Sequence, residues 1–315
     1  MLNSTSDPGN VTLMFSYTNG VDDVTRTVFL ITSLLCFSFF SYFIAIMLKV
    51  FFTTPHMQEN PRYVLFVNML INDTLFIIST NFIVVSYMHS VYFPVIVCFI
   101  IQSFFGTFFL VTPYNLAVMS LERYIAICFP LRHVQLCTPR RAIYAIAVIW
   151  AIGLSLSTVN FITVIYFAER NSYSVYELCG AIKIISPIQN VVRAFNNILS
   201  FTMVALIIVF TYINVMLVAR RVGSGRSSAI KAGKTVMLHA FQLILCTASL
   251  ISTVTETYVN NYLFYLIISN YVLFTCVPRF LSPVIYGVRE EDFRKHIRKY
   301  CTISCVCRPQ QGFKK

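Results

Sequence analysis

Seven long apolar stretches dominate this chain of 315 residues and leave few folds open to it. A helix needs about 20 predominantly apolar residues to cross the hydrocarbon core of a bilayer, and each stretch meets that length. Charged residues make up only 11% of the chain, whereas a soluble domain carries about a quarter. The sequence therefore predicts an all-α membrane protein, a seven-transmembrane helix bundle with spans at 27–52, 62–87, 95–127, 140–166, 194–219, 231–257 and 262–287.

Lysine and arginine are distributed unevenly between the two sets of loops. If the N-terminus lies outside, the outer segments hold four of the 24 basic residues and the inner segments nineteen, with Arg279 inside the last span. Because basic residues accumulate in cytoplasmic loops, we expect that orientation. The predicted organisation is an extracellular N-terminal segment (1–26), the bundle (27–287), a short amphipathic cytoplasmic helix (288–300) and a cytoplasmic tail (301–315).

Both terminal regions carry candidate modification sites. Residues 1–25 lack an apolar core typical of a cleavable signal peptide, so the first span is expected to target the chain. Asn3 and Asn10 begin glycosylation sequons, which a Ser/Thr-rich segment also produces by chance. The helix at 288–300 should lie on anionic lipid of the inner leaflet. Three cysteines follow it and are candidates for palmitoylation, with free thiols as the alternative: Cys301, Cys305 and Cys307.

The distribution of charge and the lack of certain motifs argue against several functional classes. A net charge of +12 would suit nucleic acid, but the basic residues follow the loops and the aromatic residues lie inside apolar spans, so no nucleic-acid partner is expected. We find no zinc-type cysteine spacing, no HExxH, GxSxG or Walker motif and no internal repeat. Neither an enzyme, a cofactor nor a transporter is therefore expected.

A Glu-Arg pair at the inner end of the third span is the strongest functional signal, in MSLERYIAICFPLRH (119–133). A charge at membrane depth is costly and usually functional. Glu122 is expected to restrain Arg123, and its release would free a cation to meet a cytoplasmic partner. The alternative is a pair that only anchors the helix at the interface.

Four stretches together carry a resemblance to the odorant-receptor family. MSLERYIAICFPLRH resembles that family's signature, MAYDRYVAIC followed by PL. HAFQLILC (239–246) resembles the start of its sixth span, and PRFLSPVIYGVREEDF (278–293) resembles its seventh-span ending, PMLNPxIYxxR. With RYVLFVNMLIND (62–73), the resemblance covers nearly the whole membrane region and looks most like a divergent fish odorant-receptor subfamily.

The resemblance implies a rhodopsin-like G-protein-coupled receptor that binds a small odorant in the outer half of its bundle. It would activate a heterotrimeric G protein of the olfactory, stimulatory type and raise cyclic AMP. Its place would be the plasma membrane of olfactory sensory cilia, among membrane lipids. A non-olfactory rhodopsin-like receptor for a peptide or lipid is the alternative. The expected coupling and switch residues are Glu122, Arg123, Tyr124, Leu131, Arg132, Lys231, Lys234, Pro283 and Tyr286.

The sequence also departs from the family pattern. SYFIAIM (41–47) lacks the Gly-Asn pair of the first span, PRYVLF (61–66) replaces PMYFF, and Ser282 replaces an asparagine before Pro283. Pro283 kinks the last span, with or without a switching role for Tyr286.

Asp73 is the only acidic residue in the middle of a span. In this receptor class that position binds sodium, and Thr112 and Ser282 are the candidate partners. A structural acid satisfied by hydrogen bonds is the alternative.

The resemblance further implies a disulfide between Cys98 and Cys179. Phe105 stands where amine receptors carry an aspartate, which argues against a biogenic-amine ligand. The last span contains no lysine for a retinal Schiff base, so an opsin is excluded. Helical spacing places several apolar residues on inward-facing sides of the spans, which predicts a mostly apolar ligand cavity. Rows of Phe and Leu at this spacing are also typical of ordinary helix packing. Its expected lining is Gln102, Phe105, Gly106, Phe109, Asn196, Ser200, Leu250, Ile251, Val254, Val272 and Thr275.

Overall fold

The computed structural model describes residues 8–89, 91–167, 176–179, 187–221 and 271–280, with short helical pieces between 230 and 247. In chain order the elements are α1 (Pro8–Thr53), α2 (Pro55–Gln58), α3 (Pro61–Met88), β1 (Tyr92–Pro94), α4 (Val95–Cys128), α5 (Pro130–Leu136), α6 (Pro139–Phe167), β2 (Tyr176–Leu178), α7 (Pro187–Arg221) and the π-helix η2 (Tyr271–Cys276).

Proline begins six of these helices, namely α1, α2, α3, α5, α6 and α7. The first helical position suits proline because the missing N–H would be unsatisfied there and the fixed φ already matches a helix. This explains why α1 and α7 begin earlier than the predicted spans, which started at residues 27 and 194. The apolar pattern marks the part of a helix that crosses the membrane, whereas proline marks where the helix starts.

Five of the described helices are long and apolar enough to span a bilayer, with candidate spans at Leu30–Thr53, Pro61–Ser86, Val95–Cys128, Pro139–Thr163 and Val191–Val218. They coincide with the first five predicted spans, and the predicted helical membrane bundle is confirmed. Most of the sixth and seventh predicted spans lies outside the described residues, as do the helix at 288–300 and the tail at 301–315.

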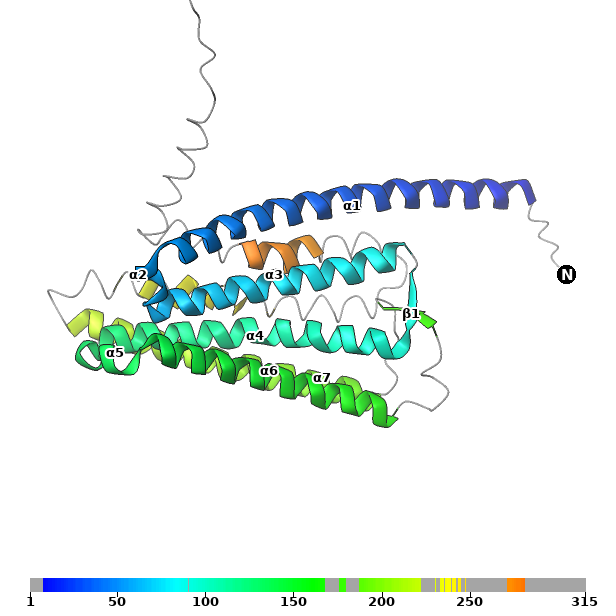
Figure 1. Ribbon diagram of the computed structural model, residues 1–315. Helices are drawn as coiled ribbons and strands as arrows, with labels where there is room; N and C mark the ends of the chain where they lie inside the picture. Colours follow the sequence, from blue (N-terminus) through cyan, green and yellow to red (C-terminus); the bar gives the residue numbers. More distant parts are fainter. Residues whose placement is uncertain are drawn as a thin grey trace, which may run out of the picture.

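Helix α4 lies at the centre of the bundle, in contact with α3, α6 and α7, while α1 runs along α3 (Figure 1). One apolar cluster joins α1, α3 and α4 and includes Phe40, Phe66, Leu70 and Leu116. A second joins α4, α7 and the helical pieces after residue 230, through Leu110, Val204, Val236 and Leu243. The buried polar residues of α3 and α4 therefore lie between two apolar layers.

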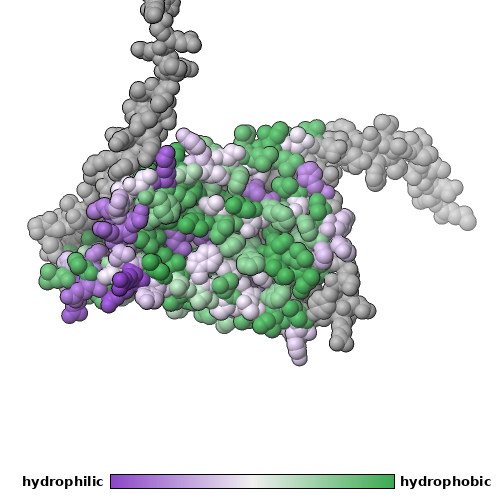
Figure 2. Space-filling model, in the orientation of Figure 1, coloured by the Kyte–Doolittle hydropathy of each residue, from purple (hydrophilic) through white to green (hydrophobic). Residues whose placement is uncertain are grey.

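The outer surface of the helices is apolar along the middle and hydrophilic at one end (Figure 2). Large apolar side chains stay exposed along the flank of α7, as in Phe195, Ile198 and Leu206. Such a surface suits lipid rather than water. The hydrophilic end, made by α2, α5 and the first turn of α6, is called the α2–α5 end (Figures 1 and 2).

The opposite end is closed by the two-stranded antiparallel sheet, which the sequence analysis did not foresee, and is called the β1–β2 end. Tyr92 pairs with Leu178, Phe93 with Glu177 and Pro94 with Tyr176. Strands of three residues carry too little alternation to be recognised from sequence.

Gly153 allows α6 to approach α4 closely. A Cβ atom at this position would lie 3.2 Å from Val111 Cγ2 and 3.4 Å from Thr107 Cγ2. We expect Gly153→Leu to lower the stability of the protein by about 1–3 kcal/mol, because overpacking forces the two helices apart. Thermal unfolding in detergent measures this. Ala151→Leu, at an exposed position of the same helix, is the control and should leave the midpoint nearly unchanged. Equal midpoints for the two variants would contradict the close approach.

Candidate functional site

Glu122 and Arg123 lie near the last turn of α4, at the α2–α5 end of the bundle. The Nε atom of Arg123 is 3.7 Å from Oε2 of Glu122, and the two side chains are 13% and 9% exposed. The pair is therefore largely shielded from water, where an ion pair is stronger than on an open surface.

His133 is a second partner of Glu122 that the sequence analysis missed. Its Nε2 atom lies 3.2 Å from Oε1 of Glu122. Pro130 begins the short helix α5 directly after Phe129, and this helix brings His133 back to the end of α4. Each oxygen of the Glu122 carboxylate thus has a nitrogen partner, one from α4 and one from α5.

Tyr124 packs between α7 and the chain that leads into α5. Its ring makes edge-to-face contacts with Phe210, at 5.5 Å between centroids, and with Phe129, at 5.7 Å. Tyr124 therefore joins the end of α4 to α7 and to the residue that directly precedes α5.

The other expected coupling residues are placed unevenly. Leu131 is 92% exposed on α5, and Arg132 beside it is exposed as well. Lys234 is exposed next to Gly233, whose Cβ position would lie 2.7 Å from Met216 Sδ of α7. Lys231, Pro283 and Tyr286 lie outside the described residues.

Asp73 is fully buried in α3, and its Oδ1 atom accepts hydrogen bonds from two side chains. The Thr112 hydroxyl donates to its Oδ1 at 3.0 Å, and Nη1 of Arg279 donates to the same oxygen at 3.1 Å. Thr112 was an expected partner and Arg279 was not, while Ser282 lies outside the described residues. A guanidinium therefore lies at the carboxylate for which a sodium ion was expected.

Two further groups surround this ion pair. The Asn72 amide donates to Thr112 Oγ1 and to the Phe108 carbonyl, each at 2.9 Å. The guanidinium carbon of Arg279 lies 4.4 Å from the centroid of the Phe76 ring, which is a cation–π distance. Arg279 itself is only 2% exposed.

The expected ligand-binding residues of α4 separate onto two faces. Phe105 stacks on Phe76 at 4.8 Å between centroids, and Phe109 lies 5.7 Å from Phe201 of α7, so both point into the bundle. Gly106 does not share this face, because its Cβ position points toward Ser157 of α6 at 3.5 Å. The Cβ position of Gly106 therefore faces α6, whereas Phe105 and Phe109 face α3 and α7.

The polar residues expected in the cavity hold neighbouring segments together. Gln102 donates from Nε2 to the Cys179 carbonyl at 3.2 Å. Ser200 accepts from the Tyr114 hydroxyl at 2.8 Å, and Asn196 donates to Asn160 Oδ1 at 3.4 Å. Val272 and Thr275 fall within η2. Leu250, Ile251 and Val254 lie outside the described residues, so the far wall of the cavity does too.

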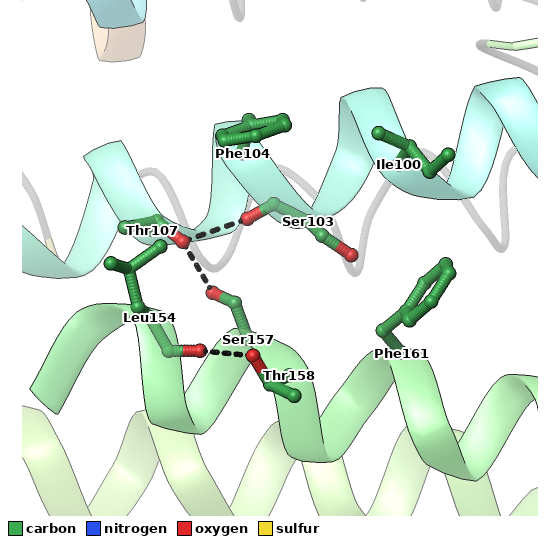
Figure 3. Close-up of a pocket in the computed structure, with 8 residues that line it drawn as sticks. All are labelled: Ile100, Ser103, Phe104, Thr107, Leu154, Ser157, Thr158 and Phe161. Carbon is green, nitrogen blue, oxygen red and sulfur yellow. Dashed lines mark hydrogen bonds between the residues drawn. The ribbon is translucent and has the colours of Figure 1, made fainter. Parts of the chain in front are cut away.

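A shallow apolar groove of about 170 Å³ runs between α4 and α6 (Figure 3). Its hydroxyls are already engaged, since Thr107 bonds Ser157 at 2.9 Å and Thr158 donates to the Leu154 carbonyl at 2.8 Å. It is lined by Ile100, Ser103, Phe104, Thr107, Leu154, Ser157, Thr158 and Phe161. Exposed Phe104 and Leu154 show that the groove opens on the outer surface, away from Phe105.

The disulfide between Cys98 and Cys179 is present, as the resemblance implied, with 5.1 Å between the Cα atoms. It joins the first turn of α4 to the residue directly after β2. Together with the β1–β2 pairing and the Gln102 hydrogen bond, it fixes this loop at the end of the bundle.

Cys137 lies in the short link between α5 and α6. Burial raises the pKa of its thiol, the Glu122 carboxylate raises it further, and Arg141 partly opposes this. The thiol is consequently protonated near neutral pH and has little nucleophilic character. Over the part of the chain that the structure describes, no cluster of three His, Cys, Asp or Glu residues is arranged to bind a metal ion.

Comparison with known proteins agrees with this geometry. The profile of the family described as "7 transmembrane receptor (rhodopsin family)" matches residues 45–286. Odorant receptor 131-2 of Danio rerio is 28% identical over 252 residues, covering 77% of this chain and 76% of the relative. Olfactory receptor 51I1 of Homo sapiens is 28% identical over 64% of this chain and 67% of its own length. Olfactory receptor 52R1 of Homo sapiens is 24% identical over 78% and 81%, respectively.

Proposed function

Because the chain belongs to the rhodopsin family of seven-transmembrane receptors, we propose that it is an odorant receptor that activates a heterotrimeric G protein. Its similarity to receptors named odorant or olfactory, over most of the chain, supports this reading. The observation that carries it is the Glu122 carboxylate held by Arg123 and His133 beside the exposed Leu131. The family acts through ligand binding, in keeping with the prediction of a receptor rather than an enzyme.

The α2–α5 end faces the cytoplasm in this proposal. Arg132, Arg140 and Arg141 are exposed there, as expected for cytoplasmic loops. The N-terminus is then extracellular, in the plasma membrane of olfactory cilia, and Asn3 and Asn10 are the sites for glycosylation. Asn3 lies outside the described residues, as do the cysteines proposed for palmitoylation, Cys301, Cys305 and Cys307.

Signalling follows from a shift between two arrangements of the bundle. In the resting arrangement Glu122 holds Arg123, and a ligand that binds the active arrangement better moves the equilibrium toward it. Freed Arg123, together with the apolar side chain of Leu131, then meets the G protein. Nucleotide exchange takes place on that partner.

The ligand is a small, uncharged and mostly apolar odorant. Phe105 and Phe109 face the bundle interior toward α3 and α7. Ser200 and Asn196 are nearby polar groups on α7, but their hydrogen bonds to Tyr114 and Asn160 must be exchanged for bonds to a ligand. Exchange of this kind yields little net energy, so apolar contact dominates affinity.

A ligand panel tests the proposal. Cells that express the receptor with an olfactory-type G protein and a cyclic-AMP reporter are exposed to small odorants, to peptides and to lipids. Odorants should raise cyclic AMP, and cells without the receptor should not respond. Activation by a peptide or lipid alone would contradict the odorant assignment and favour a non-olfactory receptor.

The His133 contact leads to a prediction about basal activity. His133→Ala removes one of the two nitrogen partners of Glu122 and should raise ligand-independent cyclic AMP about twofold to tenfold, because such a hydrogen bond contributes roughly 0.5–1.5 kcal/mol. Gln135→Ala, at an exposed position of the same helix, is the control. Unchanged basal cyclic AMP at equal surface expression would show that His133 does not stabilise the resting state.

A further inference from the structure

The receptor class suggests a sodium ion at Asp73, and the donor groups in this chain allow that suggestion to be tested. Oδ1 of Asp73 accepts from both Thr112 and Arg279. Thr112 Oγ1, the other expected ligand, accepts from the Asn72 amide at 2.9 Å. Two buried oxygens of the same cluster, Asp73 Oδ2 and Asn72 Oδ1, accept no hydrogen bond within the described part of the chain. Hydrogen bonding alone therefore does not exclude a sodium ion, and the charge of Arg279 decides the question.

The buried charges at this site argue against a second cation. Asp73 is completely buried and Arg279 is 2% exposed. Little water is therefore present to screen either charge from a further ion. The guanidinium already neutralises the carboxylate, and a sodium ion placed within a few ångströms would be repelled by it.

We propose that Arg279 is a built-in counter-cation that takes the place of sodium at Asp73, so that this receptor is not regulated by sodium. A dissolved ion leaves its site when the bundle rearranges, but Arg279 is covalently part of the last span. The cation therefore moves with the helix whenever that span moves. The statement about sodium regulation rests on the proposed receptor function. The ion pair between Asp73 and Arg279 rests on geometry alone.

Arg279 contacts α3 through Asp73 and through Phe76. The Phe76 ring covers its guanidinium, and that ring in turn stacks on Phe105 of the predicted ligand cavity. Two turns earlier in its own segment, the Tyr271 hydroxyl donates to Asn81 Oδ1 at 2.9 Å. The segment that carries the cation is thus bonded to α3 at Tyr271 and at Arg279. Only the Phe76 ring lies between the guanidinium and Phe105 of the predicted cavity.

Between these two ties the segment forms the π-helix η2 (Tyr271–Cys276). Single π-turns within helices are rare and frequently mark functional positions. The wider turn changes the register of the residues that follow it, among them Arg279, which pairs with Asp73.

Thermal unfolding of the purified receptor in detergent tests the proposal, since it needs neither a ligand nor a G protein. The midpoint is measured in sodium chloride and in choline chloride at the same ionic strength. A bound ion would raise the midpoint in its own salt, because it binds the folded state alone. We expect the same midpoint in both salts. A higher midpoint in sodium would overturn the proposal even if the receptor later proves to sense odorants, and failure of the odorant assignment would leave this result untouched.

Two variants make the test independent of the wild-type result. Arg279→Gln leaves Asp73 without its cation, so the midpoint should fall by about 5 °C or more and should now rise on adding sodium. The double variant Asp73→Asn/Arg279→Gln should recover most of the loss and show no sodium effect. Arg141→Gln, on the exposed surface of α6, is the control.

If Arg279→Gln does not accumulate, the yield of folded protein replaces the midpoint as the readout. Recovery of folded receptor in the double variant supports the pair. A double variant that is no better than Arg279→Gln, or an Arg279→Gln protein as stable as the wild type, overturns it.

Discussion

Replacing Arg123 with alanine is expected to reduce ligand-driven cyclic AMP at least about tenfold while the receptor still reaches the cell surface. Truncation removes the cation that Glu122 restrains at the end of α4, and a tenfold loss corresponds to only about 1.4 kcal/mol of differential interaction. Arg140→Ala, an exposed arginine at the same end of the bundle, is the matched control. Full signalling by Arg123→Ala at normal surface expression would remove Arg123 from the mechanism.

Glu122→Gln provides the opposite arm of this experiment. Loss of the carboxylate frees Arg123 from its ion pair and leaves His133 without its acidic partner. Basal cyclic AMP should therefore rise by at least as much as with His133→Ala. A pair that only anchored α4 at the membrane interface would behave differently, because both Glu122→Gln and Arg123→Ala would lower surface expression and neither would raise basal activity.

Cys98→Ser or Cys179→Ser is expected to remove most mature receptor from the cell surface. The bond closes a loop of 81 residues, and removing a native disulfide typically costs about 2–5 kcal/mol. Surface expression and thermal unfolding both measure the loss. The double variant should be no worse than either single variant, because each single change already breaks the whole bond.

Cys36→Ser, at a free cysteine of α1, is the control for these substitutions. Peptide mapping without reduction provides the direct chemical check. A peptide pair linked through Cys98 and Cys179 is expected, whereas alkylation of both thiols in the unreduced protein would contradict the assignment.

The membrane helices could be predicted from sequence because an apolar stretch of span length has few alternatives. Their polar extensions could not, since a helix continues beyond the membrane wherever nothing stops it. Helix α1 reaches back to Pro8, far ahead of its candidate span at Leu30–Thr53. The short helix α5 was missed for a related reason, as seven residues give too little periodicity, and with it the sequence analysis missed the His133 contact.

Facing directions within the bundle were predicted less well than helix positions. Adjacent residues on a helix point about 100° apart, so Phe105 and Gly106 could not both lie at the centre of one face. The structure turns Phe105 toward Phe76 and Gly106 toward Ser157. Asp73 and Arg279 were recognised as the two charges inside the spans, but spacing along the chain does not reveal that residues 206 positions apart form a pair.

The central claim is that the end of the bundle carrying Glu122, Arg123 and α5 faces the cytoplasm, where a G protein can reach it. Epitope tags placed before Met1 and in the α5–α6 link at Thr138 test this directly in transfected cells. Antibody should bind the N-terminal tag on intact cells and the Thr138 tag only after permeabilisation. Binding to the Thr138 tag on intact cells would place Arg123 outside and contradict the account.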